Sequence, residues 1–75
     1  MVTFEVPKNT TMEIAVYNLC GEKVKTLFSG PLLSGRHIIP WDGTDERGAW
    51  AASGIYFIQA RGEEVAAAAK IVLVR

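Results

Sequence analysis

The chain has 75 residues, of which 49% are hydrophobic and 21% charged, and its eight basic residues balance its eight acidic ones. A chain of this length is expected to form one small domain over residues 1–75, with an unfolding free energy on the order of 4–11 kcal/mol. Zero net charge argues against nucleic acid and anionic membranes as partners, and the apolar content argues against disorder. No apolar run reaches the roughly 18 residues of a membrane span, and Met1 leads into a strand-like segment without a signal-peptide pattern.

Proline and glycine residues divide the chain at regular intervals, and the segments between them alternate apolar and polar side chains. This period of two is typical of half-buried strands. The predicted strands are, in chain order, Val2–Val6, Met12–Leu19, Val24–Phe28, Arg36–Trp41, Ile55–Arg61 and Glu64–Arg75. We expect Ser29-Gly30-Pro31 to break the third strand. Pro40 lacks a ladder donor and should place the fourth strand at an edge or end it in a bulge.

The last segment, Glu64–Arg75, also fits a second structure. Four consecutive alanines after two acids favour a helix on intrinsic propensity. The β-branched tail Ile71–Val74 and the short Gly62-Glu63 turn favour a hairpin instead, because tertiary pairing can override propensity. We predict a strand, and no helix longer than about one turn anywhere in the chain.

Strands at intervals of roughly 8–12 residues, with turn residues between them, predict an all-β antiparallel sandwich. Its core should be formed by the inward positions of the alternating segments. These are Phe4, Ile14, Val16, Leu27, Ile39, Trp41, Tyr56, Ile58 and one face of Ile71–Val74.

Three acids follow the fourth strand in one short loop. Asp42, Asp45 and Glu46 could supply oxygen ligands to a hard cation, although their spacing does not match the twelve-residue calcium loop. They also lie too close together in one loop to oppose each other across a hydrolytic cleft. The simpler interpretation is that Asp42 accepts hydrogen bonds from the amides of Gly43–Asp45 and fixes the turn. We therefore predict no metal and no other cofactor.

The sequence offers few candidates for a catalytic nucleophile or a general base. His37 could pair with Cys20 or Ser34, but no strained nucleophile elbow precedes either residue. A single cysteine excludes an internal disulfide and fits no zinc spacing, so we expect Cys20 to be half-buried beside a turn, or to form an intermolecular bridge. We predict no catalytic residues and no enzymatic activity.

Trp50 is the best candidate for a small-molecule contact. Alanines flank it in a predicted loop, and an exposed indole there could stack on a sugar ring. The alternative is that Trp50 packs against the end of the sandwich or a neighbouring domain.

Several segments together carry a family resemblance: Val6-Pro7, Ile14–Val24, Leu33–His37, Trp41–Asp45, Gly48, Ser53–Phe57 and Lys70–Arg75. They resemble the immunoglobulin-like domain family of the flagellar hook-capping protein. The same pattern is shared by C-terminal modules of secreted bacterial proteins, including type IX secretion sorting domains. The resemblance covers almost the whole chain and implies a sandwich of about seven strands, of immunoglobulin or fibronectin type III character.

The resemblance also implies that the chain is the C-terminal module of a longer exported bacterial protein, acting outside the cell or on its surface. Three features depart from the family pattern. Cys20 stands where a leucine or similar residue is usual, Trp50 replaces an aliphatic or polar residue, and the alanines at 66–69 replace a segment rich in threonine and lysine.

The leading functional hypothesis is a non-catalytic module for sorting, surface attachment or protein docking. The alternatives are a carbohydrate-binding accessory domain that uses Trp50, and a scaffold module of flagellar hook assembly. The C-terminal strand is nearly free of charge, and at a sheet edge it could pair with another chain or with a second copy. We expect its last residues to be the recognition element: Lys70, Ile71, Val72, Leu73, Val74 and Arg75.

Overall fold

The computed structural model describes residues 2–63 and 66–74. Within these ranges the chain forms six strands: β1 (Val2–Val6), β2 (Thr10–Tyr17), β3 (Lys23–Leu32), β4 (Gly35–Ile39), β5 (Gly54–Gly62) and β6 (Ala66–Leu73). The described residues contain no helix, and therefore none that could cross a membrane. The all-β prediction is confirmed. The resemblance implied about seven strands, and the described residues form six. The connection between β4 and β5 adds an isolated bridge between Thr44 and Trp50.

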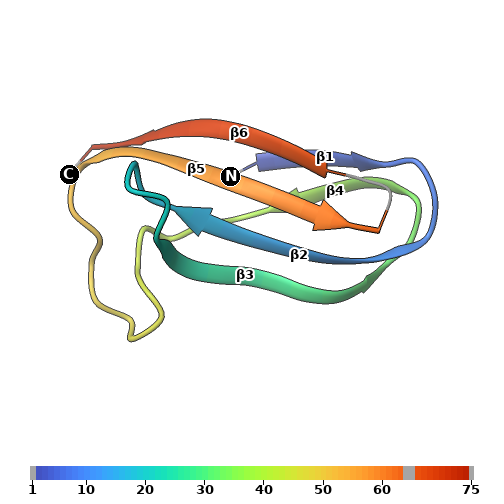
Figure 1. Ribbon diagram of the computed structural model, residues 1–75, viewed down its shortest axis with the longest axis horizontal. Coiled ribbons are helices and arrows are strands. Elements are labelled where there is room, and N and C mark those ends of the chain that lie inside the picture. The colour runs from blue at the N-terminus through green and yellow to red at the C-terminus, as the bar shows by residue number, and fades with distance from the viewer. Residues whose placement is uncertain (1, 64–65, 75) are drawn as a thin grey trace.

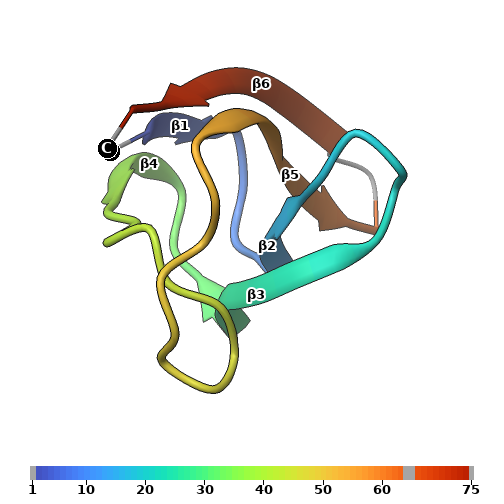
Figure 2. The ribbon, with the colours of Figure 1, turned by 90° about the vertical axis from the view of Figure 1, so that its left-hand side faces the viewer.

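The strands form two antiparallel sheets that pack as a sandwich. β1 pairs with β4 in one sheet, and the other has the order β3-β2-β5-β6. The strands run along the long axis of the molecule (Figure 1), which measures 35 × 20 × 19 Å. Seen end-on, the two-stranded sheet lies against the curved four-stranded sheet (Figure 2). β2 and β5 are the central strands, and β3 and β6 are the two edges.

The core lies between the sheets, on the inward positions of the alternating strands. Ile14, Val16 and Ile58 are its largest fully buried side chains, and all three come from the central strands β2 and β5. Every residue predicted for the core either belongs to the buried cluster or packs against it, including Ile71 and Leu73 from β6. The alternation of apolar side chains therefore predicted the inner face correctly.

The alanine run is extended, and the helical alternative is wrong for the described residues. Ala66–Ala69 pair antiparallel with Ala60, Arg61 and their neighbours on β5. Hairpin pairing satisfies the backbone groups that a helix would have bonded internally, so tertiary context overrides the preference of alanine for a helix. Residues 64, 65 and 75 of the predicted strand lie outside the described residues.

The predicted break at Ser29-Gly30-Pro31 is also wrong. β3 continues through these residues to Leu32, with Pro31 opposite Thr11 of β2. An edge strand needs ladder hydrogen bonds on one side only, so a proline is tolerated there. β4 belongs to a two-stranded sheet and is therefore an edge strand, as the missing donor of Pro40 predicted, but it ends at Ile39, two residues earlier than expected. β2 ends at Tyr17, two residues earlier than expected, because Asn18 begins the following turn.

The core makes a direct prediction about stability. Ile58→Ala should lower the unfolding free energy by about 2–5 kcal/mol, because it leaves a cavity between the sheets where Ile58 is 0% exposed. Ile38→Ala is the matched control: Ile38 is 59% exposed, and the change should cost under about 0.5 kcal/mol. Urea denaturation measures both. Equal effects would contradict the described core.

Candidate functional site

The connection between β4 and β5 (residues 40–53) is the longest loop of the domain, and two aromatic residues hold its ends. Nε1 of Trp41 donates a hydrogen bond to the carbonyl oxygen of Thr44 at 2.9 Å. The hydroxyl of Tyr56 donates a hydrogen bond to the carbonyl oxygen of Ala52 at 2.6 Å. The rings of Trp41 and Tyr56 meet edge to face, with centroids 5.2 Å apart. Both side chains bury their apolar body against the core and use their polar atom to fix the loop backbone.

Asp42 organises the first turn of the loop together with Thr44 and Lys25. Oδ1 of Asp42 accepts the backbone N–H of Thr44 at 3.0 Å and its hydroxyl at 2.6 Å. The Thr44 side-chain oxygen in turn accepts a hydrogen bond from Nζ of Lys25 at 2.8 Å, and Nζ lies 3.8 Å from Asp42 Oδ1. The two hydrogen bonds from Thr44, followed by the charge of Lys25, lower the pKa of Asp42. The predicted hydrogen bond from the turn to Asp42 is present at the amide of Thr44.

Asp45 and Glu46 have separate structural roles. Oδ1 of Asp45 accepts the N–H groups of Arg47 and Ala49, at 2.9 and 3.0 Å, and closes a second turn. In that turn Gly48 has a φ of 82°, which favours glycine. Oε1 of Glu46 accepts the N–H of Thr26 on β3 at 2.6 Å, and the N–H of Glu46 donates to the carbonyl oxygen of Val24 at 3.2 Å. The loop is therefore bonded to the outer edge of β3.

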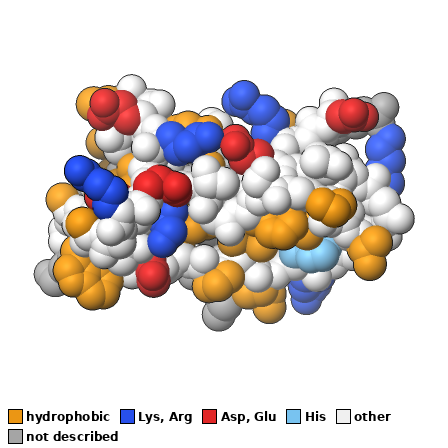
Figure 3. Space-filling model, turned by 90° about the horizontal axis from the view of Figure 1, so that it is seen from below, with side chains coloured by type: hydrophobic (Ala, Val, Ile, Leu, Met, Phe, Trp, Pro, Cys, Tyr) orange, Lys and Arg blue, Asp and Glu red, His pale blue; other side chains and the backbone are white. Residues whose placement is uncertain are grey.

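The three carboxylates do not form a cation site in the described structure. Each is engaged by a different part of the backbone, and no group of three His, Cys, Asp or Glu side chains among the described residues could hold a metal ion. Viewed from below, basic and acidic side chains are interleaved over one half of the molecule, while apolar side chains gather around the histidine in the other half (Figure 3). The charges on this face largely compensate one another.

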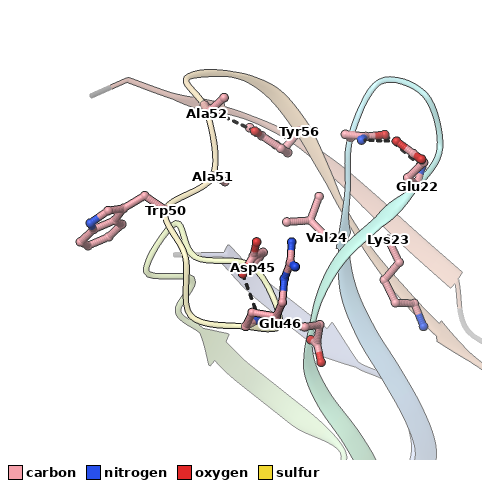
Figure 4. Close-up of a pocket in the computed structure, with 11 residues that line it drawn as sticks. Glu22, Lys23, Val24, Asp45, Glu46, Trp50, Ala51, Ala52 and Tyr56 are labelled. Atoms are coloured by element: carbon pink, nitrogen blue, oxygen red, sulfur yellow. Dashed lines mark hydrogen bonds between the residues drawn. The ribbon is translucent and has the colours of Figure 1, made fainter.

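An open depression of about 590 Å³ lies between the long loop and the turn that joins β2 to β3. Its lining mixes both charges with apolar surface, including Glu22, Lys23, Val24 and Asp45. Trp50 is 69% exposed, and its ring points away from Val24 and Asp45 (Figure 4). At this exposure Trp50 does not pack into the end of the sandwich, and packing against a neighbouring domain stays a prediction. Trp50 is nevertheless among the residues that line the depression, so stacking of its exposed indole on a sugar ring stays a prediction.

The other sequence candidates are Cys20, Ser34 and His37. Cys20 is exposed, not half-buried, because Oδ1 of Asn18 binds the amides of Cys20 and Glu22 and holds the turn away from the core. Nε2 of His37 lies 2.6 Å from the carbonyl oxygen of Leu33, on the opposite sheet from that turn. The backbone N–H of Ser34 donates to Oδ1 of Asn9. Among the described residues, no hydrogen bond joins His37 to Cys20 or to Ser34.

The predicted recognition strand lies at a sheet edge, and the two edges of the four-stranded sheet differ. The β3 edge is covered at Val24 and Thr26 by Glu46. At the β6 edge, the structure shows no backbone hydrogen bond to any described residue outside the β5 ladder. Ile71 and Leu73 face the core, and Val72 and Val74 are 63% and 81% exposed. Lys70 is exposed on the same strand, and Arg75 lies outside the described residues. Open edges of this kind are pairing sites for other chains.

The sequence did not predict the structural roles of two side chains in the long loop, Thr44 and Glu46. Thr44 is 8% exposed and joins Asp42 to Lys25, and Glu46 covers the β3 edge. The Asp-x-Thr spacing of Asp42 and Thr44 is a local signal for the first contact. No local signal exists for the second, because Glu46 and Thr26 are 20 residues apart in the chain.

The two tryptophans provide a matched test of the loop. Trp41→Ala should cost about 3–5 kcal/mol, because it removes a ring from the core together with a loop hydrogen bond. Trp50→Ala should cost under about 1 kcal/mol, because its ring is largely in solvent. Urea denaturation compares them directly, and a Trp50 variant as unstable as the Trp41 variant would contradict the exposed position of Trp50.

The lowered pKa of Asp42 predicts a pH dependence. A carboxyl whose pKa is lower in the folded than in the unfolded state stabilises the fold above its unfolded pKa of about 3.9, and this contribution is lost as pH falls through the folded pKa. Asp42→Asn should therefore be less stable than the parent chain at pH 7, and the difference should shrink below about pH 4. As a second measurement, Thr44→Val should raise the pKa of Asp42, followed by carboxyl NMR titration. A stability difference that stays constant down to the lowest pH would contradict this role.

Comparison with known proteins gives one match. No curated protein and no solved structure matches the chain. The family model described as FlgD Ig-like domain matches residues 2–65, which include β1 to β5 and the long loop. Nothing in these comparisons supports the likeness to type IX secretion sorting domains. The matched range, together with the two antiparallel sheets, shows that this chain belongs to the FlgD Ig-like domain family.

Proposed function

We propose that the domain is a non-catalytic docking module of flagellar hook assembly, and that it binds a partner protein by adding an extended segment of that partner to β6. The observation that carries the proposal is the open edge of β6 in a sheet whose other edge is covered by the domain's own loop. Family membership supports a structural role in an assembly and favours hook assembly over the sorting function that we first expected.

The energetics of strand addition suit this edge. An edge strand of eight residues presents about four N–H and four C=O groups away from its neighbour. A partner strand would satisfy these groups and would cover the exposed side of Val72 and the half-buried Ile71 and Leu73. Backbone hydrogen bonds then provide affinity, and the alternating side chains provide specificity.

The other proposed functions have less support. A carbohydrate site could use Trp50, which lines the open depression, but its ring points away from Val24 and Asp45 (Figure 4), and the family match gives no support for sugar binding. Action outside the cell, as part of an exported protein, stays a prediction.

The test is made in cells that carry the full-length parent gene. Val72→Pro removes one backbone donor within β6, and Val74→Pro makes the same change one residue after the strand ends. We expect Val72→Pro to reduce hook formation strongly, counted by electron microscopy, and Val74→Pro to leave it close to normal. Val72→Lys, which places a charge on the edge without changing the backbone, is the second variant in case the proline prevents folding.

Two outcomes would contradict the proposal at different levels. Normal hooks with a folded Val72→Pro domain, and also with Val72→Lys, would show that β6 is not the docking edge. Normal hooks after deletion of the whole domain would show that the module does not act in hook assembly.

A further inference from the structure

The face of β5 and β6 that points away from the core has an unusual charge. The buried positions Tyr56, Ile58 and Ala60 point inward, so the alternate positions of β5 and their partners on β6 point outward. The paired outward residues are Ile55 with Val72, Phe57 with Lys70, Gln59 with Ala68, and Arg61 with Ala66. We call these eight residues the β5–β6 outer face. It combines exposed apolar surface with two cations and contains no acid.

The two cations of this face have no ion-pair partner among the described residues. Glu13 of β2 lies opposite Arg61 in the register, but its Oε2 is 3.2 Å from Nζ of Lys23. The other ion pairs between described residues join Lys25 to Asp42 and Arg36 to Glu5, both away from this face. Glu63 lies beyond the end of β5 and lines a separate depression with Lys8 and other residues. Although the chain has no net charge, neither Arg61 nor Lys70 forms an ion pair within residues 2–63 and 66–74.

This surface also adjoins the edge that the proposed function uses. Lys70 and Val72 belong to β6 itself, and Arg61 lies one strand further in. A hollow of about 230 Å³ beside the alanines of β6 is lined by Gln59 and Arg61. A side chain that projects from a strand added to β6 therefore has room to approach the guanidinium group of Arg61.

We propose that the partner segment that pairs with β6 is acidic on one face: its outward side chains include carboxylates that meet Lys70 and Arg61, and its remaining outward contacts are apolar residues against Val72. This inference rests on the proposed docking at β6 and specifies the chemistry of the partner there. Opposite charges on neighbouring strands stabilise pairing, and like charges oppose it. The uncompensated cations thus select an acidic extended segment and reject a basic one.

A second copy of the chain is a poorer occupant of the same edge. Antiparallel self-pairing of β6 about a two-fold axis keeps the two outer faces on the same side of the joined sheet. Lys70 lies near the middle of β6, so the two Lys70 side chains would lie close together. Repulsion between them opposes the dimer, and Arg61 of each copy adds charge of the same sign.

The test uses the 75-residue chain and three synthetic extended peptides that alternate valine with glutamate, glutamine or lysine. Fluorescence anisotropy of the labelled peptides measures binding at low and high salt. We expect the acidic peptide to bind at least about threefold more tightly than the neutral one, the basic peptide to bind most weakly, and the preference to decrease at high salt. Arg61→Gln with Lys70→Gln should abolish the preference. Arg47→Gln, which removes one charge from an exposed position in the long loop, should leave it unchanged.

The outcomes separate this inference from the docking proposal on which it rests. Equal binding of the acidic and neutral peptides, with both weakened by Val72→Pro, would overturn the acidic preference and leave docking at β6 in place. Binding that Val72→Pro does not weaken, or no binding by any peptide, would overturn both. Concentration-dependent dimerisation through β6, seen by analytical ultracentrifugation and blocked by Val72→Lys, would identify a second copy as the occupant and overturn the inference.

Discussion

The burial of one apolar face shared by β2 and β5 is the constraint on which the rest of this domain depends. Ile14, Val16 and Ile58 occupy the centre of that face and are fully buried. A chain of 75 residues can form only one such core, so the two-stranded sheet must cover the inner face of the four-stranded sheet. The two-stranded sheet covers the central strands first. The outer strands of the larger sheet are left with partial burial, as Ile71 and Leu73 show.

This arrangement leaves the four-stranded sheet with two edge strands, β3 and β6, and the outer sides of these strands differ. The β3 edge carries Pro31 and is bonded to Glu46 of the long loop, and both features discourage pairing with another chain. The β6 edge has Lys70 as the single charged side chain among its described residues. An edge that is left open next to one that is closed directs any strand addition to a single side of the molecule. This asymmetry is what connects the fold to a docking function.

The long loop links core packing to edge protection. Trp41 and Tyr56 reach from the core to fix the loop backbone, and Asp42, Thr44 and Lys25 set its first turn. The loop held in this way places Glu46 against β3. The acids that resembled a cation site in the sequence therefore serve the architecture. Arg61 and Lys70, which form no ion pair within the described residues, lie on the β5–β6 half of the four-stranded sheet.

The sequence by itself determined those features that depend on neighbouring residues. Period-two alternation predicted the strands and the inward positions, and the Asp42-Gly43-Thr44 spacing predicted a turn, because side-chain direction and turn hydrogen bonds are local properties. The tertiary structure alone decided the extended conformation of Ala66–Ala69, the continuation of β3 through Pro31 and the exposure of Trp50. It also decided, for the part of the chain that the structure describes, which sheet edge has no further backbone partner and that Arg61 and Lys70 form no ion pair. These features depend on pairing between residues distant in the chain, and no local pattern encodes which strand will be a neighbour and which will be an edge.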